Sequence, residues 1–336
     1  MAGRAGTHDA RSQTDPRGRQ ADRPSDIPKQ GWLDIAKRVW ADISQYEVSV
    51  VSAGVAFNLF FALFPALAAA ISLYGLVADP ATVEHQLAVM GGVLPGDVTK
   101  LVGDQLHGLA RASEGTLGVS LALSLLIALW GATRGIKGMM SGLNIVYQED
   151  EQRGFFRYNL TALALTLAAI VFGILSLVMV AAVPALLKFL PVSEGIQSLL
   201  SFLRWPLLAV FLLFGLAVTY RYAPSRDEPH WRWVSWGAVV AAALWLIGSG
   251  LFSLYAAKFG NYNKTYGSMA AVAVTLLWFQ LSSFIVLLGG LINAEMEHQT
   301  ARDTTKGPER PMGSRDATMA DTLGPERHQV RNTRGK

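Results

Sequence analysis

Six stretches without a charged residue run through this chain of 336 residues. They are 31, 19, 30, 16, 25 and 30 residues long. A helix rises about 1.5 Å per residue, so roughly 20 apolar residues cross a hydrocarbon layer roughly 30 Å thick. The shortest stretch, 205–220, also suffices if the flanking Arg204 and Arg221 extend toward the lipid head groups. The pattern predicts an all-α, polytopic membrane protein with six spanning helices. We place them at about residues 52–77, 117–138, 158–183, 203–222, 233–257 and 268–294.

The charged residues indicate how these helices are oriented. The chain is 51% apolar and only 16% charged, and its charges lie almost wholly between the apolar runs and in the tails. With the amino terminus in the cytoplasm, 23 of the 29 Lys and Arg residues fall on the cytoplasmic side. The positive-inside rule therefore predicts that both termini are cytoplasmic. This distribution explains the net charge of +4 without a nucleic-acid partner, and we expect none.

The two ends of the chain differ in composition from the apolar middle. Residues 1–31 and 299–336 are polar and carry many Gly, Pro, Arg and Asp residues. Such segments bury little apolar surface, so we predict a disordered cytoplasmic arm and a disordered cytoplasmic tail. The membrane domain is then 32–298, and deleting 1–28 or 303–336 is expected to leave it folded.

Two further helical segments are predicted outside the spans. In 32–46 apolar residues recur at helical spacing, namely Trp32, Ile35, Ala36, Val39, Trp40 and Ile43. The other face is polar and carries Asp34, Lys37, Arg38 and Asp42. This amphipathic helix fits the cytoplasmic interface, and it fits equally well as a helix packed on the bundle. The connection 79–114 carries a second apolar stripe, which predicts a two-helix elbow on the periplasmic surface.

Small residues mark two of the spans. Gly131, Gly135, Gly138 and Gly142 lie on one face of the second helix and include two GxxxG units. Such a face lets another backbone come close, so we interpret it mainly as a packing face, with a moving helix or an adjacent groove as the alternative. Pro65 lies within the first helix and is a candidate kink, because it removes a backbone hydrogen bond.

Four segments resemble a known family. The first is Ser52-Ala-Gly-Val-Ala-Phe-Asn-Leu-Phe-Phe-Ala-Leu-Phe-Pro65, and the second runs from Arg134-Gly-Ile through Leu143-Asn144-Ile-Val-Tyr147 to Arg153-Gly-Phe. The third is Tyr220-Arg221-Tyr-Ala-Pro224 leading to Trp233-Val-Ser-Trp-Gly237, and the fourth combines Tyr266-Gly-Ser268, Trp278, Gly289 and Asn293-Ala294-Glu295. Their order and spacing over residues 32–298 resemble the YihY/BrkB family of bacterial inner-membrane proteins. One departure is Asn58, where an aromatic residue is expected.

The resemblance implies a six-helix protein of the bacterial inner membrane with a role in envelope integrity and a "virulence factor" label. It also implies an older label, ribonuclease BN. It brings no catalytic site that could be assigned residue by residue.

The residues favour no hydrolytic enzyme. Phosphodiester hydrolysis usually needs metal-bound water held by clustered carboxylates or histidines. The acidic triplet Glu149, Asp150 and Glu151 is better explained as solvated loop, the six histidines are far apart, and there is no cysteine. We therefore expect no catalytic residues, no metal and no cofactor.

A coupled ion pump is also disfavoured, because no ionisable residue lies at a helix centre. The largest polar groups there are Asn58 and Gln280, which either bond to neighbouring helices or line a polar path.

Basic residues gather at the predicted cytoplasmic helix ends. They are Arg134, Lys137, Arg153, Arg157 and Arg221. They are candidate contacts for anionic lipid head groups, and ordinary positive-inside anchoring is the alternative.

The leading hypothesis is an inner-membrane protein of envelope maintenance that moves or flips a lipid or a lipid-linked molecule. The alternatives are a scaffold that docks envelope partners and, less favoured, a membrane-bound nuclease for tRNA. Membrane lipids are the expected partners, and the sequence leaves open a homo-oligomer, the substrate and any energy source.

Overall fold

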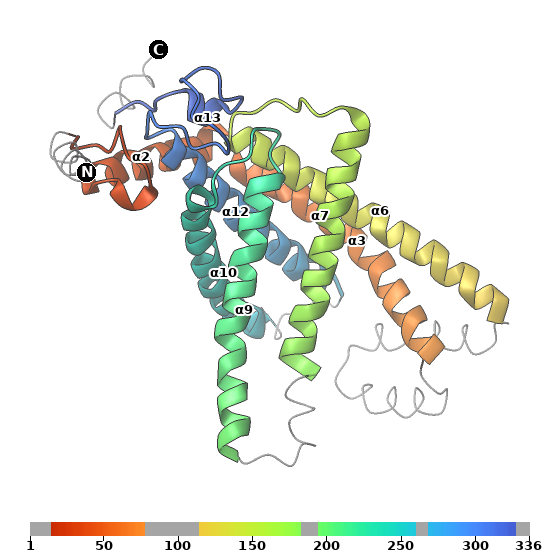
Figure 1. The fold of residues 1–336 in the computed structure, drawn as a ribbon. Helices are drawn as coiled ribbons and strands as arrows, with labels where there is room; N and C mark the ends of the chain where they lie inside the picture. Colours follow the sequence, from red (N-terminus) through yellow and green to blue (C-terminus); the bar gives the residue numbers. More distant parts are fainter. Residues whose placement is uncertain (1–14, 78–113, 183–193, 260–267, 327–336) are drawn as a thin grey trace, which may run out of the picture. The chain divides into compact units, whose positions relative to one another are not determined.

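A computed structural model describes residues 15–77, 114–182, 194–259 and 268–326 (Figure 1). Its regular elements are helices, and within these residues the only strand-like feature is an isolated bridge between Pro229 and Thr305. The long helices are α2 (Lys29–Gln45), α3 (Val48–Val77), α6 (Glu114–Val146), α7 (Phe155–Leu177), α9 (Glu194–Tyr222), α10 (Trp231–Phe259) and α12 (Ser268–Glu297). The short ones are η1 (Pro24–Asp26), the π-helical η2 (Val178–Ala182) that continues α7, and α13 (Thr318–Asp321). The all-α class is confirmed.

Five helices in the described part of the chain are long and apolar enough to cross a membrane. They are Val48–Ala66, Phe155–Val180, Gly195–Tyr222, Trp231–Ala256 and Met269–Glu297. These five fall where five of the six spans are predicted. The other prediction coincides with α6, which is not among the five, so the sixth crossing and the side of the termini stay predictions. The predicted elbow, 79–114, lies outside the described residues except for the first residue of α6.

α9 differs from its prediction. It begins at Glu194 rather than near residue 203, so Arg204 lies inside the helix, with its guanidinium 5.2 Å from the ring centroid of Trp205. The predicted span begins at residue 203, next to the charged Arg204, whereas the residues before Arg204 include Leu199, Leu200 and Leu203, which favour helix. The rings of Phe172 on α7 and Phe211 on α9 stack 4.4 Å apart, so these two helices run side by side.

The chain divides into two units. The first comprises residues 1–52, 139–251 and 281–336, and the second comprises 53–138 and 252–280. In the second unit the glycine face of α6 lies against α3. A Cβ on Gly131, Gly135 or Gly138 would meet Ala62, Leu59 or Val55, respectively, at 2.6–3.4 Å. In the first unit a Cβ on Gly142 would lie 2.8 Å from Leu287 and 2.9 Å from Val51. These close approaches agree with the interpretation of the four glycines as a helix-packing face. Pro65 lies inside α3, which continues past it.

The core of the first unit forms where α10 and α12 cross. A Cβ on Gly289 would lie 2.7 Å from Cβ of Ala241 and closer still to the hydroxyl of Tyr220. Only glycine permits this approach. The amide of Asn293 joins the same two helices, since its oxygen accepts from Gly237 N and its nitrogen donates to Val234 O. Trp233 of α10 and Leu287 and Leu291 of α12 are buried, and buried Tyr147 would lie 3.6 Å from a Cβ on Gly290.

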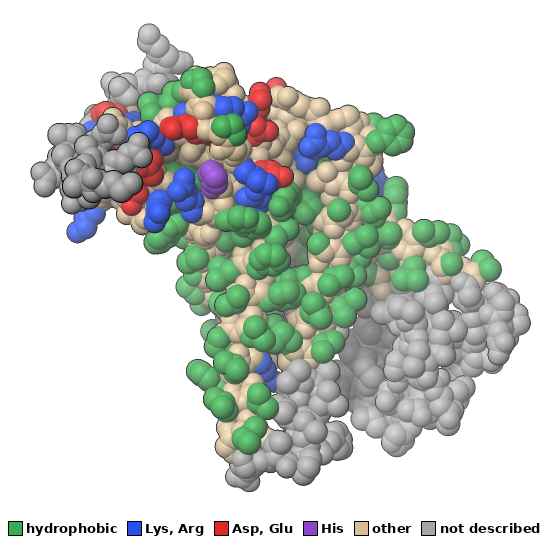
Figure 2. Space-filling model, viewed as in Figure 1, with side chains coloured by type: hydrophobic (Ala, Val, Ile, Leu, Met, Phe, Trp, Pro, Cys, Tyr) green, Lys and Arg blue, Asp and Glu red, His purple; other side chains and the backbone are tan. Residues whose placement is uncertain are grey.

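One end of the first unit is polar (Figure 2). Four segments make up this end, and we call them together the polar end. They are 15–28, 147–154, 223–230 and 298–326. Two of them, 15–28 and 298–326, hydrogen-bond to one another. Ala301 N donates to Arg19 O at 2.8 Å, Thr300 Oγ1 to Ala21 O at 2.8 Å, and Arg19 Nη2 to Gly324 O at 2.7 Å. The prediction of disorder therefore fails over residues 15–31 and 299–326, while 1–14 and 327–336 lie outside the described residues.

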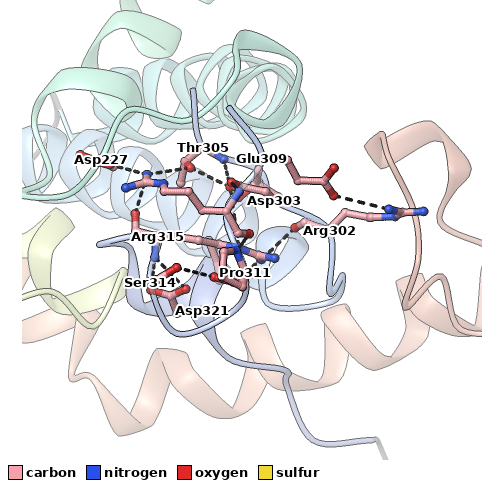
Figure 3. A network of polar contacts seen from close by, with 12 residues as sticks. Asp227, Arg302, Asp303, Thr305, Glu309, Pro311, Ser314, Arg315 and Asp321 are labelled. Atoms are coloured by element: carbon pink, nitrogen blue, oxygen red, sulfur yellow. Dashed lines mark hydrogen bonds and ion pairs between the residues drawn. The ribbon is translucent and has the colours of Figure 1, made fainter. Parts of the chain in front are cut away.

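The tail owes its order to polar contacts rather than to apolar surface. The guanidinium of Arg315 is buried and donates to the carbonyls of Ala301, Arg302 and Ala320 at 2.6–3.1 Å (Figure 3). Each of these carbonyls would otherwise need water. Local composition indicates disorder because it shows neither these bonds nor those that join the tail to Arg19 and Ala21, far away in the sequence.

α2 also buries a different face from the one predicted. Ile35 and Val39 are buried as expected, but Trp40 is exposed, and two charged residues of the predicted polar face are buried instead. Asp34 accepts from Arg17 at 2.5 Å, and Arg38 pairs with Glu295 of α12. Ion pairing makes the burial of these charges tolerable. Because these buried residues contact its own unit, α2 is a helix packed on the rest of that unit rather than one lying free in the membrane interface.

Candidate functional site: an arginine pocket

An open cavity of about 470 Å³ lies at the polar end of the first unit. Four segments build it: the start of α7, the end of α9, the loop after α9, and the tail. The residues that line it are Gln152, Arg153, Arg157, Thr161, Arg221, Tyr222, Pro224, Ser225, Arg226, Asp227, Glu228 and Asp316. We call this cavity the arginine pocket. It brings together three of the five basic residues predicted to contact head groups.

Arg153 ties the start of α7 to the end of α9. Its guanidinium forms two hydrogen bonds of 2.7 Å with the carboxylate of Glu151 and donates to the carbonyl of Ala223 at 2.9 Å. Burial raises the pKa of Glu151, but the bonds and charge of Arg153 outweigh it and hold the pKa below its ordinary value. The charge of Arg153 is therefore already compensated at neutral pH.

Arg157 lies one turn further along α7 and is exposed. Within the described residues its guanidinium has no hydrogen bond and no ion pair. The helix itself begins at Phe155 after Gly154, which provides no side-chain cap. The first N–H groups of a helix lack internal acceptors and carry partial positive charge. The start of α7 therefore contributes positive potential beside Arg157.

Arg221 and Arg226 also line the pocket, and the side chains of both are buried. Arg221 donates to Pro229 O at 2.5 Å and to the carboxylate of Glu228 at 2.7 Å, and it stacks over Trp231 at 4.6 Å. Arg226 forms an ion pair of 2.6 Å with Glu297, and both side chains are fully shielded from solvent. These two arginines hold the loop after α9 in place.

The carboxylates of the pocket form ion pairs with basic side chains of the protein. Asp227 accepts from Arg310, and Asp316 lies 3.6 Å from the same guanidinium. Glu228 pairs with Arg221 and lies 4.0 Å from Lys306. By contrast, four lining side chains that can donate have no hydrogen-bond partner within the part of the chain that the structure describes. They are Gln152, Arg157, Thr161 and the hydroxyl of Tyr222.

Exposed apolar side chains adjoin the pocket. Phe155 and Phe156 at the start of α7 are 76% and 87% exposed, and Leu160 and Trp231 are exposed as well. Figure 2 shows hydrophobic side chains over the helices and charged ones gathered at the polar end. Aromatic residues at a helix end are typical of the membrane–water interface. The pocket thus lies where the chain passes from lipid-facing helix to polar surface.

The other predicted residues lie elsewhere. Arg134 and Lys137 belong to the second unit, where Arg134 stacks over Trp130 at 4.7 Å. Asn58 donates to Gly54 O of its own helix at 2.9 Å, and no described hydrogen bond joins it to Gln280.

Sequence reasoning missed several of the lining residues. These are Gln152, Thr161, Arg226 and the acidic Asp227, Glu228 and Asp316. The position of Arg226 in the same short connection as Arg221 could have indicated it.

The acidic triplet is divided among other partners. Glu149 accepts from Thr318 N at 2.7 Å, Glu151 binds Arg153, and Asp150 is exposed. Across the described segments, no group of three or more His, Asp or Glu side chains is arranged to hold a metal ion.

The family model described as "Virulence factor BrkB" matches residues 39–313, most of the chain. The chain belongs to the BrkB family. The match covers every lining residue of the arginine pocket except Asp316. The five apolar helices described above indicate a multi-pass membrane protein, and several relatives are named as membrane proteins.

The chain is similar to several curated proteins. The ribonuclease-like protein YfkH of Bacillus subtilis is 30% identical over 267 residues, which cover 78% of this chain and 94% of that protein. A UPF0761 membrane protein of Idiomarina loihiensis is 34% identical over 106 residues, 31% of this chain and 36% of the relative. A UPF0761 membrane protein of Vibrio cholerae is 29% identical over 171 residues, 48% of this chain and 55% of the relative. No solved structure matches.

Proposed function

We propose that this BrkB-family chain is a protein of the bacterial inner membrane that moves a lipid or a lipid-linked molecule in envelope maintenance. The observation that carries the proposal is the arginine pocket. It is open, it offers unpartnered donors, and it adjoins exposed apolar side chains at the ends of two membrane-crossing helices. A lipid presents the matching combination of a polar head group and apolar tails.

The proposal assigns no enzymatic reaction to the chain. The name of the Bacillus subtilis relative raises a ribonuclease as the competing function. A metal-dependent nuclease needs carboxylates free to bind a cation. The pocket carboxylates instead face arginines and Lys306, and the triplet 149–151 is divided among separate partners. These contacts favour lipid handling over hydrolysis.

The test is lipid movement by the purified full-length protein in liposomes. Fluorescent anionic and zwitterionic lipids would be placed in one leaflet, and their loss from it would be followed for the wild type, Arg157→Ala and Arg232→Ala. Arg232 is an exposed arginine at the start of α10 and does not line the pocket, so it is the matched control.

We expect head-group-dependent movement that Arg157→Ala reduces and Arg232→Ala keeps. Movement no faster than in empty liposomes would contradict the proposal and favour the partner-docking alternative. Cleavage of a tRNA precursor by the same preparation would instead favour the ribonuclease.

A further inference from the structure

The arginine pocket has more hydrogen-bond donors than acceptors left to satisfy. Its three carboxylates are engaged by Arg221 and Arg310, and three of its four arginines are engaged by carboxylates. The donors that remain come from Arg157, Thr161, Gln152 and Tyr222, none of which has a partner within the described residues. A ligand rich in acceptors complements these donors, and a negative charge on it complements Arg157.

The arrangement suits a phosphate group better than a carboxylate. Arg157 offers a planar fork of N–H groups, and guanidinium pairs with phosphate in a bidentate manner. Thr161 lies one turn further along the same face of α7, and the uncapped start of this helix adds positive potential. A tetrahedral anion can accept from several directions at once, as these donors require.

The pocket adjoins exposed aromatic residues at the start of α7, where lipid head groups are expected. Arg157 and Thr161 lie in the first two turns of α7, which begins at Phe155, and they are four residues or about 6 Å apart along its axis. Exposed Phe155, Phe156 and Trp231 adjoin this level. Acyl chains of a bound lipid would therefore run along the exposed apolar surface of α7 and α9.

We propose that the arginine pocket binds the phosphate of an anionic phospholipid head group, with Arg157 as its principal ligand. This inference rests on the proposed function and names the substrate class for the same site. A soluble phosphate ester presents the same chemistry, so the experiment includes both sources.

The test is binding, measured apart from movement. The full-length protein in a maltoside detergent, which contains no phosphate, would be titrated with phosphatidic acid, phosphatidylglycerol and diacylglycerol of identical acyl chains. Native mass spectrometry would count the bound lipids, and glycerol 3-phosphate would be added as the soluble probe. The variants are Arg157→Gln, Thr161→Val and the control Arg232→Gln.

The wild type is expected to retain both phospholipids and not diacylglycerol. Arg157→Gln should weaken binding by at least about tenfold, the size of one charge-assisted contact, and Arg232→Gln should leave it unchanged. Binding of glycerol 3-phosphate as tight as that of phosphatidic acid would assign the pocket to a soluble phosphate ester. Equal retention of diacylglycerol, or equal losses in Arg157→Gln and Arg232→Gln, would overturn the inference.

Two outcomes separate this inference from the proposed function. Binding that depends on Arg157 without lipid movement in liposomes would keep the head-group site and reject the transport role. Lipid movement without selective binding would keep the transport role and reject the head-group site. Should Arg157→Gln fold poorly, Thr161→Val and the comparison of phosphatidic acid with diacylglycerol on the wild type decide the matter.

Discussion

An added methyl group at Gly289 would change the stability of the folded protein. Its backbone approaches Gly237, Ala241 and the hydroxyl of Tyr220 so closely that a Cβ cannot fit without a shift. We expect Gly289→Ala to destabilise the protein by about 1–3 kcal/mol through overpacking. Thermal unfolding in detergent checks this. Gly250→Ala lies on α10, the helix that Gly289 of α12 approaches, but has nothing within 4 Å of the added Cβ, so it should be neutral or slightly stabilising. Equal melting temperatures for both variants would contradict the close crossing.

Arg226 and Glu297 form a buried ion pair whose two members should behave very differently alone and together. Arg226→Met leaves the carboxylate of Glu297 buried without its charge partner, which costs about 3–5 kcal/mol. The double variant Arg226→Met/Glu297→Leu removes both charges, and we expect it to recover much of that loss. Unfolding of the two single variants and the double variant gives the coupling. Additive losses would show that the pair does not exist in the folded protein.

At the scale of elements, the tail is part of the fold. Thr304 donates to Glu297, Arg315 satisfies three carbonyls, and Arg38 reaches Pro325 O. Deleting 299–336 should therefore lower the melting temperature by roughly 5 °C or more, whereas composition alone predicts no effect. Deleting only 327–336 keeps every contact named above and is the control. A full-length melting temperature after the larger deletion would contradict the docked tail.

The docked tail should also be sensitive to acid. Burial raises the pKa of Asp303, but hydrogen bonds from Thr305 and Arg310 and the charge of Arg315 outweigh it and lower that pKa. The folded chain then binds the proton less readily than the unfolded chain. Asp303 stabilises fully above its ordinary pKa of about 3.9, and the contribution is lost as the pH falls through the lower folded value.

The measurement is the melting temperature in detergent between pH 7 and pH 3. Asp303→Asn should lower it at neutral pH and lose part of the decline on acidification. Parallel curves for the variant and the wild type would show that Asp303 does not contribute in this way.

Across the whole molecule, the features that could be predicted are those carried by local pattern. Apolar runs long enough to cross a membrane identify the long helices, because lipid leaves the backbone few alternatives. The ordered tail could not be predicted, since it is joined to residues far away in the sequence: Ala301 N donates to Arg19 O, Thr300 to Ala21 O, and Arg38 to Pro325 O. The pocket lies between these cases. Arg153, Arg157 and Arg221 could be predicted from their place at helix ends, whereas Asp316 reaches the pocket only through the folding of the tail.

The paired terminal segments bear on the number of membrane crossings. Residues 15–28 and 298–326 hydrogen-bond to one another, so they lie on the same side of the membrane. The chain between them must then cross an even number of times. Five candidate crossings are found in the described residues, and α6 is the segment we expect to supply a sixth.

The chain has no cysteine, so single cysteines can report this topology. Ser25→Cys and Met312→Cys, both exposed, should react with an impermeant maleimide only from the cytoplasmic side. Labelling of the two positions from opposite sides would exclude an even number of crossings.

The pairing of the two terminal segments also has a consequence during synthesis. Residues 15–28 and Arg38 leave the ribosome well before their partners, which lie between Glu295 and Pro325. Throughout translation the early segment must wait in solution with an unpaired guanidinium. A nascent chain that stops before α12 can insert its helices, yet it cannot close the polar end, and the start of such a chain would remain open to proteases and chaperones.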